Sequence, residues 1–186
     1  MERGEMRGRL CLIGAGLLML AGCADEPARQ TSLPAPEVVR LPAASAGGAC
    51  QLVDYPTIEE VTGVRFDVSA ASRHEKTDTC VLRGEDADGP ELALSVSPTT
   101  ADAAIFADEV VPRGGKTVKG LGKAAYHVAV KPAKNSGPGL EVGWLTGDKR
   151  LVSLHYTFPE GEAQAAAEEF ADKLVALAKK IDTSSL

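Results

Sequence analysis

The side chains with the most distinctive chemistry in this sequence are its four cysteines. Cys11 lies inside an apolar run and Cys23 follows two small residues, whereas Cys50 and Cys80 lie far apart in the remaining chain. Two isolated thiols without CxxC spacing or nearby histidines make a poor zinc site. If the chain is exported, we expect a Cys50–Cys80 disulfide, which the chain-entropy estimate values at roughly 3.5 kcal/mol.

The histidines and acidic turns offer weaker candidates for metal binding. His127 and His155 are predicted on the polar faces of their strands, where a cross-strand metal pair is the alternative to plain solvent exposure. His74 is expected in a charged loop between strands. The turn 84–89 is rich in carboxylates but lacks the spacing and closing Glu of an EF-hand, so a solvated turn is the preferred interpretation.

Motifs of catalysis are incomplete. The tripeptide Gly115-Lys116-Thr117 resembles the end of a phosphate-binding loop, but Val110 stands where that loop needs glycine. The sequence contains no G-x-S-x-G turn, and no nucleophile, base and orienting group can be assembled from it. We therefore expect a protein that is not an enzyme and that holds no cofactor or metal.

The first residues predict export. Three arginines precede the apolar run 10–20, which has the length of a signal-peptide core and is shorter than the roughly 20 residues of a membrane-spanning helix. The following Leu20-Ala21-Gly22-Cys23 resembles the lipobox of bacterial lipoproteins. That resemblance implies cleavage before Cys23, diacylglycerol and acyl chains on that residue, and a location on the extracytoplasmic side of the cell membrane. An ordinary signal peptide that happens to carry a cysteine is the alternative.

The rest of the chain divides into a tether and a domain. Residues 23–48 are rich in proline and alanine without apolar periodicity, so we interpret them as a lipid-anchored tether. The predicted domain spans residues 49–182, and residues 183–186 form a short tail. With 20 basic and 26 acidic side chains the net charge is −6, which argues against a nucleic-acid partner.

Periodicity within the domain predicts an α+β fold, an antiparallel sheet packed against helices in the order helix, strands, helix, strands, helix. The first helix is expected to begin with a capping box at Thr57 and to end at Gly63. A second helix is predicted up to Val111, with Ile105 and Phe106 buried. The final helix is predicted over residues 162–181, and the repeated theme suggests an internal duplication.

Strands are predicted at 66–68, 79–83, 91–97 and 126–130, followed by a hairpin that turns at Gly147-Asp148. The inward faces are expected to carry Tyr126, Val128 and Val130 on one strand and the alternating apolar residues of the hairpin on the other two. The glycines of Gly120-Leu121-Gly122 are expected to make a tight bend with positive φ.

The segments "QLVDYPTIEEVTG", "TCVLRG" and "VKGLGKAAY" are similar to those of small actinobacterial lipoproteins of the domain of unknown function 3558. The resemblance covers residues 49–181 in layout. Lys123 stands where that family's "GLGDAA" has an acid, and Val81 and Leu82 occupy a region where tryptophan is frequent. The resemblance implies an extracytoplasmic lipoprotein domain and supplies no catalytic residues.

Two functions of different classes remain open at this point. The first is an interaction or regulatory module that contacts an envelope protein or lipid. The second is a carrier that holds a lipid or small molecule in a cavity between helices and sheet, lined by residues such as Trp144 and Phe106.

Overall fold

Alternating apolar and polar residues form one antiparallel sheet with the strand order β1-β2-β3-β7-β6-β5-β4. The computed structural model describes residues 40–185, so the predicted signal peptide, Cys11, Cys23 and most of the tether lie outside the described residues. The predicted α+β class is confirmed. The strands are β1 (Val68–His74), β2 (Thr77–Arg83), β3 (Glu91–Pro98), β4 (Lys116–Thr117), β5 (Ala124–Val130), β6 (Gly139–Leu145) and β7 (Arg150–Thr157).

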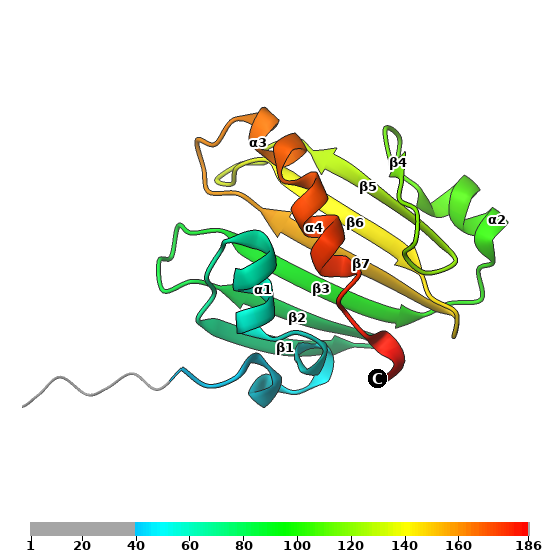
Figure 1. Ribbon diagram of the computed structural model, residues 1–186, viewed down its shortest axis with the longest axis horizontal. Helices are drawn as coiled ribbons and strands as arrows, with labels where there is room; N and C mark the ends of the chain where they lie inside the picture. The colour runs from blue at the N-terminus through cyan, green and yellow to red at the C-terminus, as the bar shows by residue number, and fades with distance from the viewer. Residues whose placement is uncertain (1–39, 186) are drawn as a thin grey trace, which may run out of the picture. The chain divides into compact units, whose positions relative to one another are not determined.

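Helices cover one face of this sheet. Figure 1 shows α1 (Tyr55–Thr62) and α4 (Ala171–Ala178) side by side in front of the strands, with α3 (Gln164–Glu169) beside β5. The predicted final helix is divided at Phe170 into α3 and α4. Within residues 40–185, no helix has the length and apolarity that a bilayer crossing requires.

The first helix begins earlier than predicted. Asp54 is its N-cap, and its side chain accepts a hydrogen bond from the Thr57 N–H at 3.2 Å. The predicted capping box at Thr57 is therefore wrong, because an acid three residues upstream already satisfies that N–H. The predicted end is confirmed, since Gly63 has φ 76° and donates its N–H to the Glu59 carbonyl.

Two apolar clusters lie on opposite faces of the sheet. The larger one joins α1 and α4 to the inward side chains of β2, β3, β6 and β7. The smaller one contains Phe106, Tyr126 and Leu145. Phe106 belongs to a π-helical turn (Phe106–Val110) that follows the short α2 (Ala103–Ile105).

The placement of β5 corrects the predicted strand face. Ala125 pairs with Trp144, and His127 pairs with Val142, so Ala125 and His127 share the face of the larger cluster. The side chains of Tyr126, Val128 and Val130 therefore lie on the opposite face. Ile105, which we predicted to be buried, is 43% exposed, because only Phe106 of that pair reaches the sheet.

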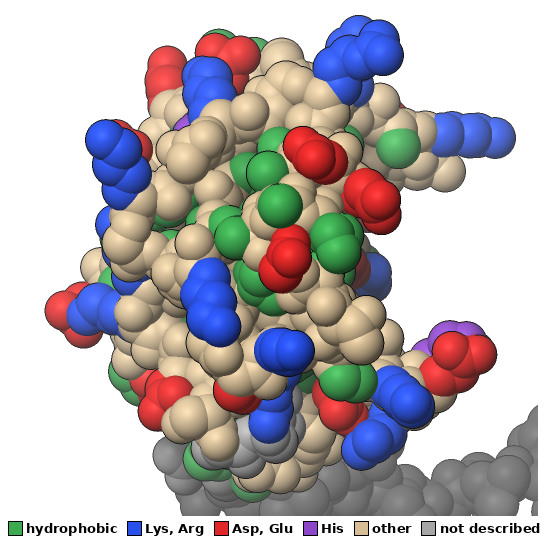
Figure 2. Space-filling view, turned by 90° about the vertical axis from the view of Figure 1, so that its right-hand side faces the viewer, with side chains coloured by type: hydrophobic (Ala, Val, Ile, Leu, Met, Phe, Trp, Pro, Cys, Tyr) green, Lys and Arg blue, Asp and Glu red, His purple; other side chains and the backbone are tan. Residues whose placement is uncertain are grey.

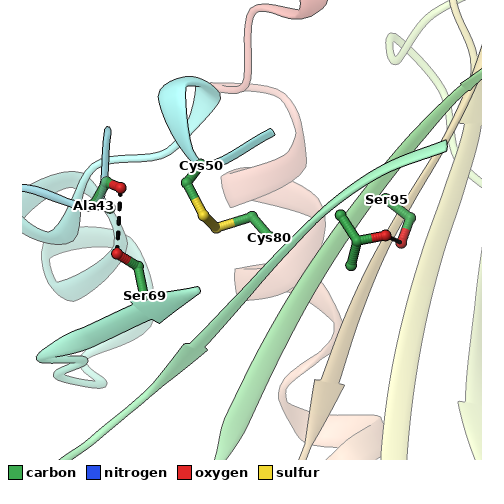
Figure 3. Close-up of a disulfide and its surroundings, with 6 residues drawn as sticks. Ala43, Cys50, Ser69, Cys80 and Ser95 are labelled. Carbon is green, nitrogen blue, oxygen red and sulfur yellow. Dashed lines mark hydrogen bonds between the residues drawn. A yellow bond between two sulfur atoms is a disulfide. The ribbon is translucent and has the colours of Figure 1, made fainter. Parts of the chain in front are cut away.

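The folded domain includes residues 40–48, which the sequence analysis assigned to the tether. Ala43 lies in a short 3₁₀ turn and is buried, and its carbonyl accepts a hydrogen bond from Ser69 of β1 at 3.2 Å (Figure 3). The Arg40 guanidinium stacks 4.4 Å from the centre of the Tyr55 ring and lies 3.2 Å from the Asp67 carboxylate. These contacts fasten the start of the domain beside β1.

Cys50 and Cys80 form a disulfide, as predicted. Cys50 lies in the second 3₁₀ turn (Gly48–Leu52), Cys80 lies on β2, and both are fully buried (Figure 3). The bond ties the segment that precedes α1 to the helix-covered face of the sheet.

We expect the variant Cys50→Ala/Cys80→Ala to lose about 3 to 4 kcal/mol of unfolding free energy, because the disulfide closes a loop of 30 residues in the unfolded chain. Denaturant titration of both proteins in the absence of reductant measures the difference. In the presence of reductant the two midpoints should converge. Equal midpoints without reductant would contradict the role of this bond.

Candidate functional site on the open face of the sheet

The face of the sheet opposite α1 and α4 carries small and polar side chains along its centre. The ladder between β3 and β7 places Ala93 opposite His155 and Ser95 opposite Ser153, and these four residues are half-buried. Thr79 of β2, the strand beside β3, shares a hydrogen bond with Ser95, with 3.2 Å between the two hydroxyl oxygens. Figure 2 looks toward the end of the molecule where α2 lies and shows a hollow on this side of the sheet.

Three polar side chains meet on this face. The Tyr126 hydroxyl of β5 donates a hydrogen bond to Glu141 Oε1 of β6 at 2.5 Å. His155 of β7 places its Nδ1 3.6 Å from Glu141 Oε2, a distance suited to an ion pair but longer than a hydrogen bond. Glu141 therefore lies between a phenol and an imidazole from the two neighbouring strands.

Two glycines make this arrangement possible. Gly139 and Gly143 lie two residues on either side of Glu141, so all three project toward the same face. A Cβ on Gly143 would lie 2.5 Å from the Tyr126 ring, and a Cβ on Gly139 would lie 2.9 Å from His155 Nε2. The absence of side chains at both positions lets the two rings lie against the strand and reach the carboxylate.

The surroundings hold Glu141 in its charged form. The adjacent His155, and then the Tyr126 hydroxyl, lower the pKa of Glu141, and this effect exceeds the opposing effect of burial. Burial and the negative carboxylate raise the pKa of Tyr126, so its hydroxyl stays a donor. The Glu141 side chain is 29% exposed and that of His155 is 33% exposed, which leaves both open to an incoming group.

This trio offers a charge and hydrogen bonds to a ligand. Among the described residues, no hydroxyl or thiol hydrogen-bonds His155, so the geometry provides no activated nucleophile beside the imidazole. An ionised acceptor on a face that also carries serine and threonine hydroxyl groups on neighbouring strands suits the binding of a polar surface.

The structure separates several residues that the sequence analysis grouped. His127 pairs with Val142 and His155 pairs with the adjacent Glu141, so the two histidines lie on opposite faces. The prediction that His127 lies on the polar face of its strand is therefore wrong, and this separation also excludes the alternative of a cross-strand metal pair. His74 ends β1 at the turn to β2. No group of three or more potential metal ligands occurs among residues 40–185.

The glycines before β5 act as predicted. Gly120 and Gly122 have φ 71° and 57°, and a Cβ on Gly122 would collide with the Leu145 carbonyl. Sequence reasoning missed the role of Glu141. The available signal was a charged residue between two glycines inside a strand, where glycine often marks the close approach of another group.

No protein-family model, curated protein or solved structure matches this chain.

We expect Gly143→Ala to lower the unfolding free energy by about 1 to 3 kcal/mol, because the new methyl group pushes the Tyr126 ring away from the strand. Gly147→Ala is the matched control, since nothing lies within 4 Å of the place its new methyl group would occupy and its φ is not positive. Chemical denaturation compares the two variants. An unchanged midpoint for Gly143→Ala would contradict the close approach.

We expect Tyr126→Phe to lower the unfolding free energy by about 1.5 to 3 kcal/mol at pH 7, because it removes a hydrogen bond to the charged carboxylate of Glu141. The pKa of Glu141 is lowered in the folded state, so the stabilisation is present above the ordinary carboxyl pKa of about 4.3 and disappears as the pH falls through the folded pKa.

Unfolding titrations of both proteins from pH 7 to pH 3 measure this dependence. Tyr156→Phe, on the other face, is the control, because the Tyr156 hydroxyl makes no hydrogen bond to a carboxylate among the described residues and its ring packs against Phe158 and Phe170. Burial, and to a smaller extent the charge of Glu162, raise the pKa of Tyr156 to about 12. A difference between wild type and Tyr126→Phe that stays constant with pH would contradict the charged acceptor.

Proposed function

We propose that this protein is a lipoprotein anchored through Cys23 to the extracytoplasmic side of the cell membrane, where it acts as an interaction or regulatory module. The lipobox-like residues before Cys23 support cleavage and acylation. A buried disulfide at Cys50–Cys80 supports export, because such bonds persist in oxidising compartments. Two or more acyl chains are needed for stable anchoring, since each buried CH₂ contributes only about 0.8 kcal/mol.

We also propose membership in the actinobacterial lipoproteins of the domain of unknown function 3558. The support is the bridge between the start of the domain and β2, together with the segment 120–125 that leads into β5. An internal duplication accompanies this proposal. Its support is that a helix and a three-stranded meander occur twice, as α1 with β1 to β3 and as α2 with β5 to β7.

The open face of the sheet carries the proposal of an interaction module. It is hollowed, and although the exposed Val68 and Val130 also lie on it, its centre presents the ionised Glu141 beside hydroxyl and imidazole groups. We propose that the partner is an envelope protein that presents hydrogen-bond donors or a cation to Glu141. A lipid tail would leave these polar groups without partners, which costs free energy.

The alternative of a carrier receives less support from the packing. Trp144 and Phe106, which were expected to line one cavity, are both buried and belong to clusters on opposite faces of the sheet. Between α4 and the sheet the space is filled by side chains such as Leu154 and Leu174. We therefore propose binding at a surface rather than inside the domain.

Site-directed photo-crosslinking in intact cells tests the proposal. A photoreactive residue at Ser153, on the open face, should capture a discrete protein, whereas the same residue at Lys180, exposed after α4, should not. Glu141→Gln keeps the shape of the site and should reduce the Ser153 product severalfold. Its unfolding free energy should fall by no more than the replacement of the charged hydrogen-bond acceptor of Tyr126 by a neutral one costs. Equal products from both positions, or a Ser153 product unaffected by Glu141→Gln, would contradict the assigned surface.

The same cells test the anchor. The wild-type chain should fractionate with membranes, and Cys23→Ser should remain as an unacylated precursor. Acylation of Cys23→Ser, measured by mass, would contradict the assigned lipid site.

A further inference from the structure

Charge is unevenly distributed along the chain. Between Glu109 and Glu141 the sequence contains six Lys and Arg residues and no Asp or Glu, although acids outnumber bases overall by 26 to 20. This segment forms β4, β5 and their flanking loops, at the sheet edge opposite β1. The protein is acidic overall, yet the edge of the sheet formed by β4 and β5 is basic. This edge lies at the opposite end of the strand order from β1.

The fold gathers part of this charge around one groove. Arg113, Lys116 and Lys131 line an open groove of about 780 Å³ together with His127. Among residues 40–185, none of the three cations lies within 4 Å of a carboxylate oxygen. Cations without internal partners are free to bind an external anion.

The other charged groups near the groove come from the helices. Glu168 of α3 lines its rim, and Asp172 of α4 is close enough to raise the pKa of His127 slightly. Burial and Lys116 outweigh this effect and lower the pKa of His127, so its imidazole is neutral at neutral pH. The groove keeps a net positive charge, because its three cations outnumber the two carboxylates of Glu168 and Asp172.

An incomplete strand pairing runs along the groove. β4 pairs with β5 only through Lys116↔His127 and Thr117↔Tyr126, and the Val118 N–H then donates to the Ala125 carbonyl. Backbone groups alternate in direction along a strand, so Ala129 directs its N–H and C=O toward the same side as Ala125. Residues 113–115 turn away there, since the Gly115 N–H bonds to the Pro112 carbonyl.

The edge of β5 beyond β4 is therefore open. Among the described residues, no backbone group pairs with Ala129 on that side. Val128, Ala129 and Pro132 line the groove, and the neighbouring Val130 is 37% exposed. An unpaired strand edge is a template for an added strand.

We propose that this groove binds an extended acidic segment of a partner protein, which adds a short strand to the edge of β5. The backbone of that segment pairs with Ala129. Its alternate side chains, on the face of His127 and Lys131, are carboxylates that contact Lys116, Lys131 and Arg113. The strand edge favours a peptide over a small anion, because only a peptide satisfies the backbone groups as well as the cations.

This site is separate from the open face, and it does not rest on the proposed function. Lys116 and His127 share the helix-covered face, whereas Glu141 and His155 lie on the other one. A failure here leaves the crosslinking result from Ser153 unaffected, and the reverse also holds.

Binding of a fluorescent heptapeptide with alternating Glu and Val, measured by anisotropy at 150 mM salt, tests the proposal. We expect saturable binding that weakens at least tenfold in Lys116→Glu/Lys131→Glu. The control Lys76→Glu/Lys180→Glu changes the net charge equally at exposed positions away from the groove and should bind like wild type. Equal loss in both double variants would overturn the proposal, because it would reflect net charge alone.

Two further arms isolate the strand pairing. Ala129→Pro removes the outward N–H of an edge position without changing charge, and it should weaken binding at least fivefold. A heptapeptide of the same sequence with N-methylated amides should bind at least fivefold more weakly to the unaltered protein. Equal binding of the N-methylated peptide would overturn the proposal, as would full displacement of the heptapeptide by inorganic phosphate at the same concentration, which would indicate a small-anion site.

Discussion

The ladder between β3 and β7 is the interaction on which the rest of this structure depends. Eight residue pairs, from Glu91↔Thr157 to Pro98↔Arg150, join a meander of β1 to β3 to a second meander of β5 to β7. No hairpin connects β3 to β7 directly, since β4, β5 and β6 intervene in the chain. The ladder therefore brings together strands that are more than fifty residues apart in sequence, and packing has to offset the cost of closing that loop.

This ladder also determines the difference between the two faces of the sheet. On one side its pairs are Leu92 with Tyr156, Leu94 with Leu154 and Val96 with Val152, all buried beneath the helices. On the other side the pairs are Glu91 with Thr157, Ala93 with His155, Ser95 with Ser153 and Ser97 with Leu151, which are mostly small or polar residues. A shift by a single residue would exchange the two sets, so the apolar pairs fix the register and thereby expose the polar face. The disulfide stabilises the helix-covered side of the sheet, because it ties the segment before α1 to β2.

Local patterns predicted the elements whose signals lie within a few residues. The hairpin of β6 and β7, the end of α1 at Gly63 and the bend before β5 all follow from alternation or glycine chemistry. The disulfide followed from elimination among four cysteines. Apart from the disulfide, whose cysteines are 30 residues apart, each of these features has its physical cause within one short segment.

The functional surfaces could not be predicted in this way, because they depend on register between strands. β5 alternates Tyr126 and Val128 against Ala125 and His127, and the larger side chains suggest the inward face. The π-helical turn with Phe106 covers those larger side chains from the other side, and this contact reverses the assignment. The meeting of Tyr126, Glu141 and His155 follows from that reversal. The open edge of β5 likewise depends on where β4 stops pairing, which no pattern within β5 indicates.

Native-state hydrogen exchange tests the central claim most directly. If the β3–β7 ladder holds the two meanders together, its amides should exchange most slowly and only through global unfolding, and the amides of β2 and β6 should lose protection together with them at increasing denaturant. Exchange of β5 and β6 through an opening of lower free energy, while β1 to β3 stay protected, would show two independent units and would contradict this account.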